Sequence, residues 1–232
     1  MRISVLGCSK GAEVYSILWT IRCARPDLKV VMHAVDTSKK VLEFAQQGTY
    51  SLTTPQLVDV PIFDRVTRAE MREMFDINGD QATVRSWIKE GITWHLADAG
   101  DPGILDLLGP QDIVVANAFL CHMDPLEAER CLRNIARLVH PGGYLIVSGI
   151  DLDVRSKIAR DQGWKPIPDL LEEIHDGDRS LRDDWPWKYW GLEPFNKRLH
   201  DTNLRYASVF QVGDSTGNLM MEPSCAGAGV VN

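Results

Sequence analysis

The stretch Ile3-Ser4-Val5-Leu6-Gly7-Cys8-Ser9-Lys10-Gly11-Ala12-Glu13 decides the fold of this chain. Its apolar beginning predicts a short buried strand over residues 2–7, and residues 11–24 predict a helix. Between them, the glycines allow a ligand to approach the backbone, and the first N–H groups of the helix are free donors. The stretch therefore predicts a ligand-binding corner at the C-terminal end of a strand.

A second strand is expected over residues 29–35, and it ends at Asp36. An acidic residue in this position can accept hydrogen bonds from both hydroxyl groups of a ribose. The order of strand, glycine turn, helix, strand and acid is therefore typical of a nucleoside-binding unit.

The spacing of the glycines narrows the choice of nucleoside. A dinucleotide fingerprint needs a glycine where this chain has Ser9, because that glycine makes room for a pyrophosphate. A P-loop is excluded, since no Gly-Lys-Ser/Thr follows a four-residue spacer. A ligand with a ribose but no phosphates fits better, and S-adenosylmethionine (SAM) is such a ligand. The alternative is that Gly7 and Gly11 only close a tight turn between strand and helix.

The composition suits one domain with elaborations, since 44% of the 232 residues are apolar. We expect this domain over residues 1–212, with a flexible tail at 213–232.

A net charge of −7 argues against a nucleic-acid-binding surface. No apolar run approaches the ~20 residues of a membrane span, and the chain enters its first strand at once, so we expect neither a membrane anchor nor a signal peptide. Five scattered cysteines indicate reduced thiols in a cytoplasm, and no Cys or His pattern indicates a metal site.

Strands and helices alternate along much of the chain, which predicts an α/β fold with a doubly wound, mostly parallel sheet. We expect helices over residues 38–47, 65–75, 101–108, 125–139, 155–160 and 169–174, and strands over 82–88, 91–96, 112–117, 144–148 and 205–212. Ligands of such sheets lie beyond the C-terminal ends of the strands. Four residues at strand ends are therefore predicted to share one rim: Gly7, Asp36, Asp98 and Asn117.

Two segments depart from this alternation. Residues 49–96 are expected to carry a small irregular or β insertion, and residues 151–204 a Trp-rich extension. In the extension, Trp187 and Trp190 are predicted to belong to an aromatic lid over an apolar or planar substrate. The alternative is that the tryptophans form the core of an added helical layer.

The motifs resemble those of the CheR-type, class I family of SAM-dependent methyltransferases. Gly7-Cys8-Ser9-x-Gly11-x-Glu13-x-Tyr15-Ser16 is similar to the family's G-C-S-T-G-E-E-P-Y-S. The stretch Ala34-Val35-Asp36-x-x-x-x-Val41-Leu42-x-x-Ala45 and the following Gly48-x-Tyr50 are similar to the family's second strand and the helix after it. Leu138-x-x-Pro141-Gly142-Gly143 is found in class I methyltransferases generally. The likeness runs from about Ser4 to Ile150 and implies a Rossmann-like methyltransferase fold.

The resemblance also implies roles for individual residues. The cofactor-binding set that it implies is Gly7, Cys8, Ser9, Gly11, Glu13, Asp36, Thr37, Asp98, Ala99, Asn117 and Ala118. In this set the glycine turn and Glu13 line the methionine and ribose, and Asp36 holds the ribose hydroxyls. Asp98 and Ala99 stand at the adenine, and Asn117 and Ala118 bracket the sulfonium. Residues 49–96 correspond to the place where the family carries a small β-subdomain.

Two departures from the family pattern bear on the acceptor. The family's chemotaxis enzymes carry a helical domain before the first strand, where this chain has only Met1, and they have Arg-Asn where it has Asn117-Ala118. Both departures weaken the expectation that the chain methylates receptor glutamates. Neither weakens the expectation that it binds the cofactor. We therefore expect a SAM-dependent methyltransferase that yields S-adenosylhomocysteine (SAH) and methylates an oxygen, such as a carboxylate oxygen, of a small-molecule acceptor.

Methyl transfer mainly requires that the nucleophile be positioned against the methyl group. A carboxylate acceptor needs no base, whereas a hydroxyl acceptor does, and His122 is the predicted catalytic base. Its alternative role is that of a helix-entry histidine that caps Asp124 or faces solvent. The rival functions are a protein-glutamate O-methyltransferase of chemotaxis type and a non-catalytic SAM- or SAH-binding regulatory module. A third rival, an NAD-dependent oxidoreductase, is disfavoured by Ser9.

Overall fold

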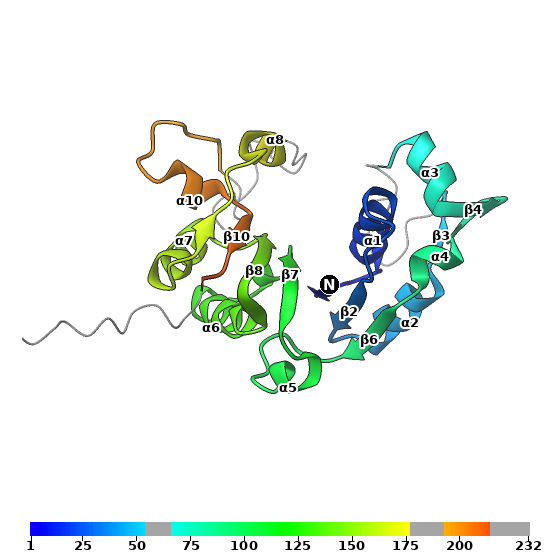
Figure 1. The fold of residues 1–232 in the computed structure, drawn as a ribbon, viewed down its shortest axis with the longest axis horizontal. Coiled ribbons are helices and arrows are strands. Elements are labelled where there is room, and N and C mark those ends of the chain that lie inside the picture. The colour runs from blue at the N-terminus through cyan, green and yellow to red at the C-terminus, as the bar shows by residue number, and fades with distance from the viewer. Residues whose placement is uncertain (54–65, 177–192, 214–232) are drawn as a thin grey trace, which may run out of the picture.

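The computed structural model describes residues 1–53, 66–176 and 193–213 of the chain. Its main feature is a seven-stranded sheet with the order β6-β2-β1-β7-β8-β10-β9 (Figure 1). These strands are β6 (Ile92–Leu96), β2 (Val31–Asp36), β1 (Arg2–Leu6), β7 (Gln111–Asn117), β8 (Val139–Ser148), β10 (Val209–Gln211) and β9 (Lys165–Pro166). The first five are parallel, and β10 runs antiparallel to both of its neighbours. The predicted doubly wound, mostly parallel sheet is confirmed.

Much of the central strands β1 and β7 is buried, because β7 is apolar over residues 113–116 and β1 carries Ile3, Val5 and Leu6 beside the buried Ser4. Their register pairs Ile3 with Ile113 and Val5 with Val115. The chain leaves β1 toward β2 on one side and later enters β7 on the other. The order of the strands therefore reverses between β1 and β7, and a crevice for ligands is expected beyond the C-terminal ends of this pair.

The helices cover the two faces of the sheet. One core cluster joins Val5 and Ala34 of the sheet to α1 (Ala12–Ala24) and α2 (Lys39–Gln47). The other cluster joins Leu6 and Val35 to α5 (Ile104–Leu108), α6 (Pro125–Ala136) and α7 (Leu152–Asp161). Neighbouring residues of one strand thus enter opposite cores, as the two-residue period of a strand requires.

A second, three-stranded antiparallel sheet has the order β3-β5-β4. Its strands are β3 (Thr49–Ser51), β5 (Gln81–Val84) and β4 (Phe75–Asn78), and α3 (Arg68–Met74) leads into β4. The Tyr50 hydroxyl of β3 donates a hydrogen bond to the carbonyl oxygen of Lys10 at 2.7 Å, which fastens this sheet to the glycine turn.

Two predicted strands are wrong in part. Residues 82–88 do not form one strand, because α4 (Ser86–Lys89) begins directly after β5. The Arg22 guanidinium donates to the carbonyl oxygens of Trp87 and Glu90, and these long-range bonds favour a helical turn here. Residues 205–212 begin not as a strand but as the end of α10 (Thr202–Tyr206), where the Arg205 guanidinium binds the Glu193 carboxylate.

Several helices differ from their predicted bounds. The helix predicted over 155–160 is the longer α7, which begins after Asp151 because that carboxylate accepts hydrogen bonds from the N–H groups of Asp153 and Val154. The helix predicted over 169–174 is α8 (Leu171–Asp176). A short 3-10 helix, η1 (Leu120–His122), precedes α6 and was not predicted. None of the described helices is both long and apolar enough to cross a bilayer.

Candidate functional site

The turn after β1 has an unusual backbone. Gly7, Ser9 and Gly11 have φ angles of +65°, +46° and +82°, in the left-handed region. Ser9 is the exception among them, because non-glycine residues seldom adopt this conformation. The Cys8 N–H donates to the Val35 carbonyl oxygen at 2.9 Å, so the turn is also tied to the end of β2.

Asp36, at the end of β2, accepts two backbone hydrogen bonds. The Ser9 N–H donates to its Oδ2 and the Ser38 N–H to its Oδ1, both at 2.9 Å. A carboxylate can accept about four hydrogen bonds, so acceptor capacity remains for two ribose hydroxyls. The structure thus brings Asp36 and the glycine turn together, as the sequence predicts.

The two glycines of the turn meet different surroundings. A Cβ atom at Gly7 would lie 2.8 Å from Cδ1 of Phe119, in the loop after β7. A Cβ atom at Gly11 would lie 3.1 Å from the Cβ of Ala45 and 3.2 Å from the ring of Trp94. Gly11 therefore makes room for the packing of α1 on α2 and β6, and its predicted contact with a cofactor stays a prediction.

Glu13, in the first turn of α1, is joined to the ends of two strands. Its Oε1 accepts a hydrogen bond from Nδ2 of Asn117 at 2.5 Å, and Oδ1 of Asn117 accepts one from the Ser148 hydroxyl at 3.0 Å. Burial raises the pKa of Glu13, and the hydrogen bond from Asn117 opposes this rise. Ser148 was missed in the sequence, where its only signal is a hydroxyl at the end of an apolar strand.

Cys8 belongs to the glycine turn, and the charges of Asp36 and Glu13 act on its thiol. Burial raises the pKa of its thiol to about 12, with the charges of Asp36 and Glu13 acting in the same direction. The side chain is therefore a neutral, buried thiol near pH 7. It packs with the apolar residues of the core, and a neutral, buried thiol is a poor nucleophile.

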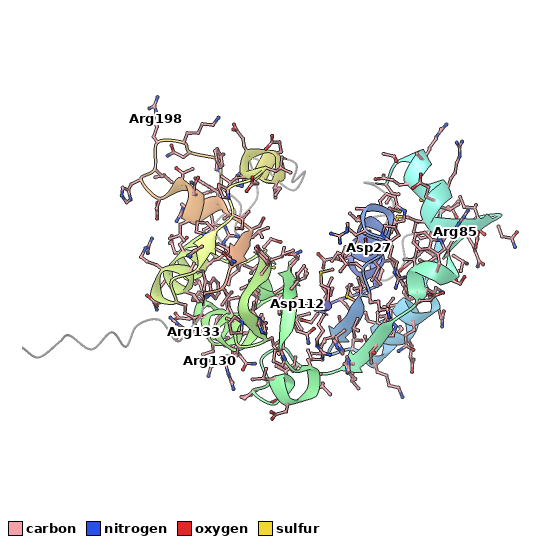
Figure 2. All side chains as sticks on the ribbon, viewed as in Figure 1. Asp27, Arg85, Asp112, Arg130, Arg133 and Arg198 are labelled. Atoms are coloured by element: carbon pink, nitrogen blue, oxygen red, sulfur yellow. The ribbon has the colours of Figure 1, made fainter. Side chains whose placement is uncertain are left out.

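Asp98 and Ala99 follow β6 at the same edge of the sheet. Asp98 is exposed and accepts a hydrogen bond from the Gly100 N–H at 2.7 Å, whereas Ala99 is buried. Between this loop and α6 lies a groove of about 700 Å³. Its lining includes Asp98, Met123 and Cys131, together with Arg130 and Arg133, which project from α6 in Figure 2.

The loop after β7 carries the remaining predicted residues. Ala118 is exposed with a φ of +57°, and its Cα would lie 2.5 Å from a Cβ atom at Gly149. His122 is exposed in η1, on the same connection as Asn117. Asp124, and not His122, caps α6 with its carboxylate. The role of His122 as a base stays a prediction.

Two further expectations concern substrate and metal. Trp187 and Trp190, predicted to contact the substrate, lie outside the described residues. Trp164 of the same extension is buried against Phe210, with ring centroids 5.7 Å apart, and belongs to the core. Within the described ranges, no group of three or more His, Cys, Asp or Glu side chains could hold a metal ion.

Comparison with known proteins agrees with the motifs. The sequence model described as "CheR methyltransferase, SAM binding domain" matches residues 1–152. A 104.1 kDa protein of Rhodobacter capsulatus, encoded in the hypE 3′ region, is 26% identical over 156 residues. That match covers 64% of this chain, which spans 15% of the relative.

Two solved structures are among those similar to this one. Magnesium protoporphyrin IX methyltransferase from Synechocystis PCC 6803, with bound SAM, is 20% identical, with a TM-score of 0.41 over 71% of this chain and 60% of that one. The N-methyltransferase NodS from Bradyrhizobium japonicum WM9, in complex with SAH, is 16% identical, with a TM-score of 0.38 over 66% of this chain and 55% of that one.

Proposed function

Because the chain belongs to the CheR methyltransferase family and carries that family's SAM-binding domain, we propose that it transfers a methyl group from SAM to an oxygen atom of a small-molecule acceptor. One observation carries this proposal. Ser9 of the glycine turn donates a hydrogen bond to Asp36, and Asn117 donates one to Glu13. All four residues lie at the C-terminal ends of the central strands or in the turn and helix that follow them. This edge is where ligands of doubly wound sheets bind.

The charge of these residues favours SAM over a phosphate-bearing nucleotide. Asp36, Glu13 and Asp98 are all acids, and they suit the donors of SAM: its ribose hydroxyls, its ammonium group and the amino group of its adenine. A pyrophosphate placed beside the same carboxylates would be repelled. When bound, SAM supplies an electrophilic methyl group on a positively charged sulfur.

The residues of the chain would act mainly by holding the two reactants in line. Such orientation contributes roughly 7–11 kcal/mol to many intramolecular reactions. A carboxylate acceptor is ionised near neutral pH and needs no base, whereas a hydroxyl acceptor would use His122 to take its proton. The departure from the chemotaxis pattern at Asn117-Ala118 supports a small-molecule acceptor.

A protein-glutamate acceptor is the second candidate, and membership of the family favours it. The test is to measure SAH release with SAM and three classes of acceptor: small carboxylic acids, small alcohols or phenols, and glutamate-rich peptides. We expect turnover with a small molecule. Turnover with the peptides alone would favour the protein acceptor, and tight SAH binding without any turnover would favour a regulatory module. In a separate calorimetric measurement, SAH should bind and NAD should not.

A further inference from the structure

Three side chains from three separate elements form one continuous chain of hydrogen bonds. Ser148 stands at the end of β8, Asn117 at the end of β7 and Glu13 in the first turn of α1. The Ser148 hydroxyl lies 3.0 Å from Oδ1 of Asn117, and Nδ2 of Asn117 lies 2.5 Å from Oε1 of Glu13. The register of the sheet pairs Asn117 directly with Ser148, so this meeting follows from the fold.

The direction of each hydrogen bond in this chain is determined by chemistry. An ionised carboxylate only accepts hydrogen bonds, so Asn117 must turn its NH₂ group toward Glu13. Its oxygen then points at Ser148, and the Ser148 hydroxyl must donate. Without that hydroxyl, the oxygen of Asn117 loses its donor, and only the carboxylate of Glu13 still favours this orientation of the amide. In the reversed orientation, its oxygen would face the oxygen of Glu13.

Glu13 has one carboxylate oxygen left for a ligand. Within the described ranges its Oε2 accepts no hydrogen bond, whereas Oε1 is held by Asn117. Burial disfavours the ionised form of Glu13 and raises its pKa, and the hydrogen bond from Asn117 counteracts this. The charge of Glu13 therefore depends on an amide that Ser148 helps to hold in place.

We propose that Ser148 is a positioning residue: its hydroxyl fixes the amide of Asn117, which holds Glu13 as a carboxylate whose second oxygen binds the ammonium group of the cofactor's amino acid. This inference rests on the proposed function, because it takes SAM and SAH as the ligands. It assigns to Ser148 an effect on one functional group of the cofactor, and not on the nucleoside as a whole. The inference can therefore be tested with ligands that carry or lack the ammonium group.

The experiment compares two ligands by calorimetry: SAH, and the analogue of SAH in which hydrogen replaces the amino group. The variants are Ser148→Ala, Ser148→Thr and Glu13→Gln. Ser156→Ala is the matched control, because it also removes a hydroxyl, but one that lies buried in α7 with no hydrogen-bond partner among the described residues. Thermal melting identifies the variants that remain folded.

We expect Ser148→Ala to weaken SAH binding roughly tenfold and to leave the affinity for the deaminated analogue nearly unchanged. Ser148→Thr, which keeps the hydroxyl, should retain most of the affinity for SAH. Glu13→Gln should bind the two ligands almost equally. Ser148→Ala should also lose SAH binding at a higher pH than the wild type as the pH falls, because Glu13 then takes up a proton more easily. Ser156→Ala should match the wild type throughout.

Two results would overturn the inference alone. One is an equal loss of affinity for both ligands in Ser148→Ala, which would mean a merely structural role. The other is unchanged SAH binding by a folded Ser148→Ala or by Glu13→Gln. If the wild-type protein bound no SAH at all, the proposed function would fail, and the inference would fail with it.

Discussion

Asp36 has a structural role as well as its expected contact with the ribose. Its two oxygens each accept a backbone N–H, from Ser9 in the glycine turn and from Ser38 at the start of α2. The carboxylate thereby holds Ser9 in its left-handed conformation. Loss of the carboxylate should therefore affect both the binding of ligand and the free energy of unfolding.

We predict that Asp36→Ala weakens SAH binding at least tenfold, since each charge-assisted hydrogen bond to a ribose hydroxyl contributes roughly 1.5–3 kcal/mol. The variant should also melt at a lower temperature than the wild type. Asp36→Asn, whose NH₂ group cannot accept one of the two backbone hydrogen bonds, should also melt at a lower temperature and bind SAH more weakly. Calorimetry that gave unchanged affinity in either folded variant would contradict the ribose assignment.

Gly11 offers a test of why a glycine stands in the turn. We predict that Gly11→Ala lowers the free energy of unfolding by more than Gly79→Ala does. Both glycines have positive φ angles, +82° and +60°, which cost an alanine about 1–2 kcal/mol. A Cβ atom at Gly11 would also meet Ala45, Trp94 and Tyr15 within 3.3 Å, whereas one at Gly79 would meet no described residue within 4 Å. Equal losses in urea unfolding would show that packing at Gly11 is unimportant.

Single elements show which parts of the fold local sequence signals can predict. The unit of β1, glycine turn, α1, β2 and Asp36 could be predicted because the apolar strands, the glycines and the acid that indicate it all lie within it. The helical turn α4 could not, because the distant side chain of Arg22 holds it. The start of β10 was misplaced because Arg205 is bound by Glu193 and Asp153. Ser148 was missed because only the register of β7 and β8 shows its partner.

The edge strand β6 and its neighbour β2 carry two histidines whose protonation couples pH to stability. Nδ1 of His33 and Nε2 of His95 lie 3.0 Å apart, and the Arg2 guanidinium lies 3.3 Å from the other nitrogen of His33. Burial lowers the pKa of both rings, and for His33 the charges of His95 and Arg2 lower it further. Protonation of this pair therefore opposes folding.

The sign of the effect follows from these lowered pKa values. Near and below the ordinary pKa of about 6.5, the unfolded chain binds more protons at these sites than the folded chain. The free energy of unfolding therefore decreases as the pH is lowered. We predict that the free energy of unfolding decreases between about pH 7.5 and 5.5, and that His95→Gln makes this decrease shallower. The raised pKa of Glu13 acts in the opposite direction, so the difference between wild type and variant is the quantity to measure. Identical slopes in urea unfolding would contradict the prediction.

At the scale of the whole molecule, the match to the family ends before the fold does. The family model matches residues 1–152, but β10 pairs with β8 in the main sheet. Trp164 and Phe210 belong to the same core cluster as Leu132 of α6 and Leu145 of β8. Described residues after position 152 therefore contribute to the core of the main sheet, and we expect them to belong to the same domain.

This shared core predicts how the protein unfolds. We expect Trp164→Ala, at a side chain that is 4% exposed, to lower the free energy of unfolding by about 3–5 kcal/mol. Because one core includes both parts, the whole unfolding transition should shift, and the near-UV and far-UV circular dichroism signals should still coincide. Leu126→Ala is the control, since Leu126 is 74% exposed on α6 and its loss should change stability little. Two separate transitions, of which only one moved in Trp164→Ala, would mean that the C-terminal segment folds by itself and that the single domain expected over residues 1–212 is in fact two.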